Sequence, residues 1–543
     1  MKTNNYIAIL LLVLGSSTQA LAQYISGVYI PDSTATPTTD TADVAVRLAS
    51  TITADDLRSY LTVLASDEYE GRETGAPGND KAAAYITEHV QSIGLQPAGM
   101  EGAYTQPVGF TFTKWADTDI FVNEERFKHL WEYVAFPAKN RSKTMIRADE
   151  VIYLGYGIDD PQYSDYKKND VAGKVIMIHK GEPVSADGKS HITGSTEQSV
   201  WATDINKKLE VAHQNGVELV LIIEDDIKGM LAENRRKLVG SSVELGILDD
   251  ADLTTANHAY ISTNIVKAIA GKRAKKLIKA RKRADKKGKA CDVPMKSDFI
   301  INMSKDVTTL ESQNVAAYIE GSTKPDEVIV VSAHYDHLGK RGEEIYNGAD
   351  DNGSGTSTIM EVAEAMSLAA SEGAAPERSV LFLWVTGEEK GLLGSAYYAG
   401  NPLFPLENTV ADVNVDMVGR VDDRYADNPH YIYVIGSDRL STDLHKINEA
   451  TNQKYTQLTL DYKYNDEEDP NRYYFRSDHY NFAKNGIPSI FFFNGTHADY
   501  HRTTDTVEKI NFEKMESVGR HIFHLVWELA NRADRIEVDG EVK

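Results

Sequence analysis

Continuous apolar runs recur through the second half of the chain, separated by segments with helical periodicity. The runs are rich in Val, Ile, Leu and Phe, and they cover residues 328–333, 380–386, 410–415 and 488–493. Strands buried on both faces of a sheet have this unbroken pattern. Helical segments separate the runs, including 354–370, and one more follows them at 512–532. The alternation predicts an α/β domain with a mostly parallel-centred mixed sheet flanked by helices.

The first and middle thirds of the chain differ in the secondary structure that their residue patterns predict. A helical pattern starts near residue 54, and a second runs from Asp80 to about Ile93, where Gly94 is a typical helix end. The middle third contains short β-like runs and a helix before Gly216. We expect one domain split across 51–115 and 299–535, a β-rich module inserted at 116–298, and a tail at 536–543.

Composition and charge exclude some classes of protein. With 41% hydrophobic and 26% charged residues among 543, the chain is globular rather than disordered. Its formal net charge of -23 argues against nucleic acid as a partner, because the phosphates would be repelled. One basic segment, 272–289, runs against this balance. It is either a polyanion-binding surface or a solvated helical face, and the acidity of the rest favours the second.

The N-terminus has the pattern of a secretory signal peptide over residues 1–22. Lys2 precedes an apolar core at 7–14, and Ala20 and Ala22 form a small-residue cleavage site. We therefore expect a secreted or periplasmic protein, with a flexible segment at 23–50. No later segment is apolar enough for stable membrane insertion, and the single cysteine, Cys291, excludes an intramolecular disulfide.

Polar residues with metal-binding or acid–base chemistry follow the ends of the predicted strands. They are His334, Asp336, Asp350, Asp351, Glu388, Glu389, Asp416, Tyr500 and His501. In open α/β sheets, ligands bind outside the carboxyl ends of the strands. Each residue alone could be a helix cap, a hydrogen-bonding group or a solvated surface residue. Several carboxylates at one sheet edge are costly unless a cation neutralises them, so together they predict a metal site.

The number of ligands indicates how many metal ions the site holds. Three carboxylates and two imidazoles exceed what one tetrahedral zinc with an open position needs. Two divalent ions roughly 3.5–4 Å apart, sharing one carboxylate, would use all five. Mixed nitrogen and oxygen ligands suit Zn²⁺, with cobalt or manganese as alternatives. A serine hydrolase is disfavoured because the chain lacks a G-x-S-x-G motif.

The motifs, in order, are H-x-D, G-A-D-D-N-G-S-G, G-E-E-x-G-L-x-G-S, D-M-x-G and Y-H-x-x-x-D. This series resembles the M28 family of zinc exopeptidases. The resemblance implies that His334 and Asp416 bind one metal ion, that Glu389 and His501 bind the other, and that Asp351 bridges them. It further implies Glu388 as the general base, Asp336 as the residue that orients His334, and Tyr500 as a phenol that polarises the substrate carbonyl. Neighbouring residues not assigned to metal are His337, Asp350, Asp478 and His479.

The resemblance also covers segments outside the site. Residues 70–99 are similar to the segment that opens the catalytic domain of the family, and the middle third resembles a protease-associated domain. Peptides are the implied substrate, with aminopeptidase action preferred over carboxypeptidase or dipeptidase action. A single-zinc glutaminyl cyclotransferase and a non-catalytic binding protein on the same scaffold are the alternatives from other classes.

Overall fold

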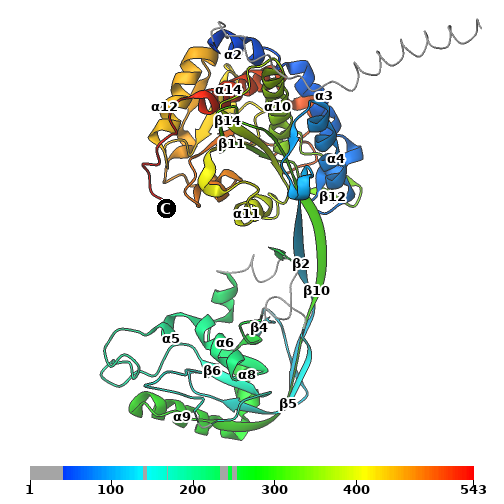
Figure 1. Cartoon of the computed structure of the whole chain (residues 1–543). Helices are drawn as coiled ribbons and strands as arrows, with labels where there is room; N and C mark the ends of the chain where they lie inside the picture. Colours follow the sequence, from blue (N-terminus) through cyan, green and yellow to red (C-terminus); the bar gives the residue numbers. More distant parts are fainter. Residues whose placement is uncertain (1–40, 138–142, 168, 233–241, 247–252, 543) are drawn as a thin grey trace, which may run out of the picture. The chain divides into compact units, whose positions relative to one another are not determined.

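The computed structural model describes residues 41–137, 143–167, 169–232, 242–246 and 253–542. The expected signal peptide and most of the expected flexible segment lie outside the described residues. Contacts divide the chain into two compact units (Figure 1). Unit 1 comprises the residues up to Gln106 and from Val315 onward, and unit 2 comprises Pro107–Asn314. Both boundaries lie within long strands, β2 (Thr105–Val122) and β10 (Val293–Ile319). Each strand continues across the boundary, so no turn or loop in the sequence marks where one unit ends.

Unit 1 contains a mixed sheet with a parallel centre, as the sequence predicts. Four strands run parallel in the order β18 (Ser489–Phe493), β15 (Thr409–Val415), β11 (Lys324–His334) and β14 (Arg378–Val385). On one side β16 (Tyr431–Ile435) pairs antiparallel with β18 and is followed by β17 (Thr459–Asp461). On the other side β10 pairs antiparallel with β14. The four apolar runs are therefore the four central strands.

Helices cover both faces of this sheet, which explains why its strands carry apolar residues on both faces. Alternate residues such as Val331 and Phe382 belong to a core shared with α10 (Gly355–Ser371) and α14 (Phe512–Asn531). α3 (Ala54–Leu64) and α4 (Pro77–Ser92) contribute to the same core. The intervening residues, such as Val330 and Leu383, pack against Tyr398 of α11 (Leu393–Gly400) and Phe482 of α13 (His479–Ala483).

The N-terminal part of unit 1 differs from the expectation of a flexible segment extending to residue 50. Residues Thr41–Ala49 form a helix, α2, which contacts α10 and α14. Ala45 and Leu48 are fully buried in the core of unit 1. The residues before α2 are rich in Thr, Pro and Asp, so composition predicts a flexible segment there. The apolar face of α2 is short, and tertiary packing rather than local propensity fixes the helix.

The strands of unit 2 belong to the same continuous sheet through β10, and the central strands of this unit run parallel. Their order is β5 (Lys143–Tyr153), β6 (Val175–His179), β7 (Leu219–Ile223) and β9 (His258–Ile261). β4 (Tyr133–Phe136) and β10 pair antiparallel at the two edges. α6 (Ile205–Gln214) packs on one face, and α8 (Thr263–Ala270) and α9 (Ala274–Lys287) pack on the other. The inserted module is therefore an α/β unit, with helices on both faces of its strands, rather than the β-rich module expected from the sequence. Across the described parts of both units, no helix has the length and apolar character to cross a membrane.

Candidate metal centre

The parallel strands of unit 1 bring the predicted site residues to one edge of the sheet. His334 is the last residue of β11, and Asp416 directly follows β15. Glu388 and Glu389 lie just beyond the end of β14, and Asp351 lies in the turn Ala349–Ser354 that precedes α10. His501 comes from the loop after β18. Because parallel strands end on the same side, residues up to 167 positions apart meet here.

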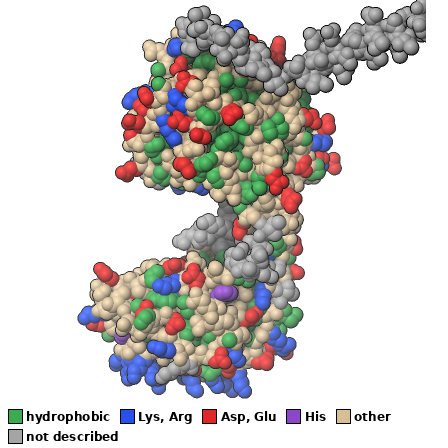
Figure 2. Space-filling model, viewed as in Figure 1, with side chains coloured by type: hydrophobic (Ala, Val, Ile, Leu, Met, Phe, Trp, Pro, Cys, Tyr) green, Lys and Arg blue, Asp and Glu red, His purple; other side chains and the backbone are tan. Residues whose placement is uncertain are grey.

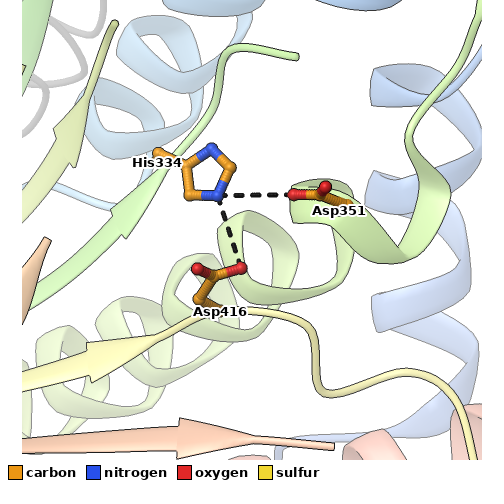
Figure 3. A group of neighbouring side chains, drawn as sticks. All are labelled: His334, Asp351 and Asp416. Carbon is orange, nitrogen blue, oxygen red and sulfur yellow. Dashed lines mark ion pairs between the residues drawn. The ribbon is translucent and has the colours of Figure 1, made fainter. Parts of the chain in front are cut away.

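One group of potential ligands surrounds the imidazole of His334 (Figure 3). Its Nε2 atom lies 3.3 Å from Asp416 Oδ1 and 3.5 Å from Asp351 Oδ1. The three side chains are almost fully buried and point toward one another. Glu388 Oε2 lies 3.9 Å from the same nitrogen, at the margin of the group. The three residues have a geometry in which they could hold one metal ion.

A second group lies on the other side of Asp351. His501 Nε2 is 3.1 Å from Asp351 Oδ2 and 3.3 Å from Glu389 Oε1. His337, which the sequence did not assign to metal, has its Nδ1 2.9 Å from Glu389 Oε1 and 3.7 Å from Asp351 Oδ2. The fully buried His337 and the partly exposed His501 therefore face the same two carboxylates. The two oxygens of Asp351 thus face two different groups.

Several of these buried atoms have no hydrogen-bond partner within the described residues. They include His334 Nε2, Asp416 Oδ1 and Glu389 Oε1. Buried polar atoms are nearly always satisfied, so a cluster of unsatisfied atoms facing one another requires an explanation. Imidazole nitrogens and carboxylate oxygens at this spacing are typical ligands of zinc and related divalent ions. The residues present therefore fit a metal centre.

Asp336 connects the first group to the loop that carries the glutamates. His334 Nδ1 lies 3.1 Å from the backbone carbonyl of Asp336 and 3.7 Å from its carboxylate. A proton on Nδ1 donated to that carbonyl leaves the lone pair of Nε2 facing the site. The Asp336 carboxylate accepts hydrogen bonds from the backbone N–H of Glu388 (3.1 Å) and the hydroxyl of Thr74 (2.7 Å). Asp336 therefore contacts His334 chiefly through its main chain.

Asp505 is a supporting residue to which the sequence analysis gave no role. Its Oδ2 accepts hydrogen bonds from the backbone N–H groups of Asp350 (2.9 Å) and Asp351 (3.2 Å). Asp505 is fully buried, and burial together with the charge of Asp350 raises its pKa to about 6. It is the final residue of the Y-H-x-x-x-D motif, which was the available signal. Asp350 itself turns away from the ligands and accepts from Gly419 N–H at 2.7 Å.

The two adjacent glutamates have opposite electrostatic environments. Burial and the neighbouring charge of Glu389 raise the pKa of Glu388 well above its usual value, although His334 opposes the shift. Burial acts in the same direction on Glu389, but the imidazoles of His337 and His501 outweigh it and lower its pKa. The same residue type at consecutive positions therefore includes one carboxyl that holds a proton readily and one that stays charged.

A pocket opens directly beside these carboxylates. It is lined by Asp351, Glu388, Asp416, Met417, Tyr473, Arg476, Phe491, Phe493, Thr496 and Tyr500. The ring of Tyr500 stacks on that of His501 with centroids 3.8 Å apart, and its hydroxyl lies 3.3 Å from a guanidinium nitrogen of Arg476. Asp478 and His479 are buried behind the site, where Ser395 donates to Asp478 and His479 stacks on Phe491. Four of the ten lining residues are aromatic and four are charged, so the pocket offers apolar contact beside the carboxylates.

Comparison with known proteins identifies relatives of this region. The family model described as Peptidase family M28 matches residues 314–526, which contain all five predicted metal ligands and Glu388. A "Probable leucine aminopeptidase" of Trichophyton verrucosum (strain HKI 0517) is 31% identical over 226 residues, covering 40% of this chain and 57% of that protein. "Leucine aminopeptidase 1" of Metarhizium robertsii (strain ARSEF 23 / ATCC MYA-3075) is 31% identical over 245 residues, covering 43% and 59%. The chain therefore spans less than two thirds of these relatives.

Among solved structures, the chain is similar to the "Aminopeptidase from Aneurinibacillus sp. strain AM-1". The match is 20% identical, covers 92% of this chain and 98% of that chain, and has a TM-score of 0.47.

Proposed function

We propose that this chain is a metal-dependent aminopeptidase with two divalent ions, most suitably Zn²⁺, because residues 314–526 match the model of peptidase family M28. The observation that carries this proposal is the position of Asp351. Its Oδ1 faces His334 and its Oδ2 faces His501, so one carboxylate can bridge two ions. His334 and Asp416 would complete one site, and Glu389 and His501 the other. Apart from its additional neighbour His337, this arrangement uses the predicted ligand set.

When bound, two such ions would supply Lewis acidity and lower the pKa of a nearby water. Glu388 would take the proton from that water at its carboxylate and later deliver it to the leaving amine. Its backbone is held by Asp336, and its side chain lines the pocket beside Asp351 and Asp416. The Tyr500 hydroxyl, held by Arg476, would donate to the substrate carbonyl oxygen.

The substrate proposal rests on the pocket and on the relatives. Met417, Phe491 and Phe493 would enclose an apolar N-terminal side chain, which agrees with the leucine aminopeptidase names of the similar proteins. One feature favours a second candidate, a carboxypeptidase or dipeptidase. Arg476 also lines the pocket and would suit a terminal carboxylate.

A substrate series distinguishes the two. The purified chain would be given one Leu-containing peptide in free, N-acetylated and C-amidated forms, with and without chelator. We expect chelator-sensitive release of the N-terminal residue from the free and C-amidated peptides, with no cleavage of the N-acetylated form. Cleavage of the N-acetylated peptide from its C-terminus would overturn the aminopeptidase assignment.

Metal analysis tests the centre independently of substrate. About two zinc ions per chain are expected, whereas one ion would favour the single-zinc cyclotransferase and none a binding protein. The protease-associated resemblance of the inserted module and the export of the chain stay predictions from the sequence.

A further inference from the structure

Helix α9 of unit 2 carries a concentration of positive charge that the proposed peptidase function does not use. Eleven of the nineteen residues 271–289 are Lys or Arg and a single one, Asp285, is acidic, although the chain as a whole has a net charge of -23. Figure 2 shows Lys and Arg side chains gathered where α9 lies in Figure 1. We propose that this face of α9 binds the surface of a membrane rich in anionic phospholipids.

The helix sorts its residues into an inner apolar face and an outer cationic face. Leu277 and Ala284 are buried in the core of unit 2, with Ala274 and Ala280 packed beside them. Lys275, Lys279, Lys282 and Lys286 have the spacing of the opposite face, and all four are exposed. From Lys275 to Lys286 they form a row about 17 Å long on the helix.

The positive charges on this face have no carboxylate partner among the described residues. Asp285 is engaged elsewhere, because its Oδ1 accepts a hydrogen bond of 2.5 Å from Tyr156. In the part of the chain that the structure describes, no Lys or Arg of 272–289 has a carboxylate within 4.0 Å. Other lysines of unit 2 do have one: Lys143 pairs with Glu218 and Lys180 with Glu224. Like charges three and four positions apart destabilise a helix, so an uncompensated row calls for an anionic partner.

Two features favour a lipid surface over a nucleic acid. Ile278 lies on the flank of the lysine row with 54% of its surface exposed, where it could enter the apolar margin of the headgroup layer. Residues 271–289 contain no Phe, Tyr, Trp or His to stack on bases, and eight of their eleven cations are Lys rather than Arg. Basic amphipathic helices of this type bind anionic headgroups by charge and depend strongly on salt.

The test uses the full chain and sedimentation with vesicles. Vesicles of phosphatidylcholine and phosphatidylglycerol at a ratio of about 7:3 are compared with pure phosphatidylcholine vesicles. We expect binding to the anionic vesicles only, and at least a tenfold loss of affinity when Lys275, Lys279, Lys282 and Lys286 are all changed to Gln, since each lysine near the surface contributes substantially. Ile278→Ser should weaken binding severalfold, because apolar contact adds to charge.

A matched variant separates this row from net charge. Changing Lys114, Lys128, Lys174 and Lys189 to Gln removes the same charge from exposed positions elsewhere in unit 2, and should leave vesicle binding nearly unchanged. Peptide hydrolysis in solution should be the same in both variants, which confirms folding. Equal binding by both variants, or binding to duplex DNA or polyphosphate without binding to the vesicles, would overturn the proposal.

Discussion

Two regions of this molecule concentrate charges of one sign, and they do so in opposite settings. At the sheet edge of unit 1, Asp351, Glu389 and Asp416 lie almost completely buried within a few ångströms of one another. On α9 of unit 2, a row of lysines is exposed to solvent. Buried like charges repel strongly in a medium of low dielectric constant, whereas exposed ones are screened by water and salt.

The comparison shows how much a charge cluster reveals about function. The buried carboxylates are hard to retain without a cation between them, and their unpaired oxygens indicate where it binds. The exposed lysines cost little and permit more than one explanation. For the carboxylates, burial means that a cation is required to neutralise their charge. For α9, the absence of acidic partners among the described residues and the exposed Ile278 are the further observations needed.

The largest expected effect comes from removing the proposed metal ions, which would leave the buried carboxylates of unit 1 without the cations that neutralise them. Treatment with a chelator should abolish peptide hydrolysis, and two equivalents of Zn²⁺ should restore it. Scanning calorimetry should show a lower unfolding temperature for unit 1 alone, since a metal at 100 times its Kd contributes about 2.7 kcal/mol of stability. A shift of equal size in unit 2, or activity that resists the chelator, would contradict the proposed centre.

Glu388→Gln tests the residue placed between the buried charges and the pocket. The amide cannot accept the proton from water, so kcat should fall roughly 10²–10⁴-fold. The zinc content should stay at its wild-type value, because Glu388 lies outside both ligand sets. Glu407→Gln, at an exposed position, serves as the control. Loss of zinc from the Glu388 variant would instead make this residue a ligand.

Asp505→Ala tests whether the backbone hydrogen bonds to Asp350 and Asp351 hold the proposed bridge in place. Metal affinity, measured by competition with a chromophoric chelator, should fall about 10–100-fold. Asp505→Asn keeps an acceptor oxygen and should lose less. The control is Asp427→Ala at an exposed position, because Asp499 would be unsuitable: its partner Arg420 also lies 3.6 Å from Asp505. Equal metal affinity in all three variants would remove Asp505 from the support of the site.

The smallest expected effect concerns the stability of α9. Changing Lys275, Lys279, Lys282 and Lys286 to Gln removes several like-charge pairs worth about 0.2–0.5 kcal/mol each. Unit 2 should therefore unfold at a slightly higher temperature at low ionic strength, with the difference vanishing in 0.5 M salt. A decrease in stability would show that these lysines have partners within the protein.

Much of the fold and the candidate site was predictable from the sequence. The four apolar runs are the four central strands, and four of the five predicted ligands lie at their ends in two adjoining groups. His337 completes the second group, and the fifth predicted ligand, His501, lies 3.1 Å from Asp351. Helix α2 was missed, because its few apolar positions acquire meaning only against α10 and α14. His337 was set aside, since nothing local shows that its ring faces Glu389.

Residue pattern by itself therefore determined which segments are buried strands and which chemistry follows each of them. This succeeded because burial on two faces leaves a local, periodic record in the chain. The tertiary structure decided which oxygen of Asp351 faces which imidazole, that Asp505 holds the backbone of that turn, and that the lysines of α9 have no acidic neighbours among the described residues. Those facts are distances between residues far apart in sequence, and only the packing of strands and helices fixes such distances.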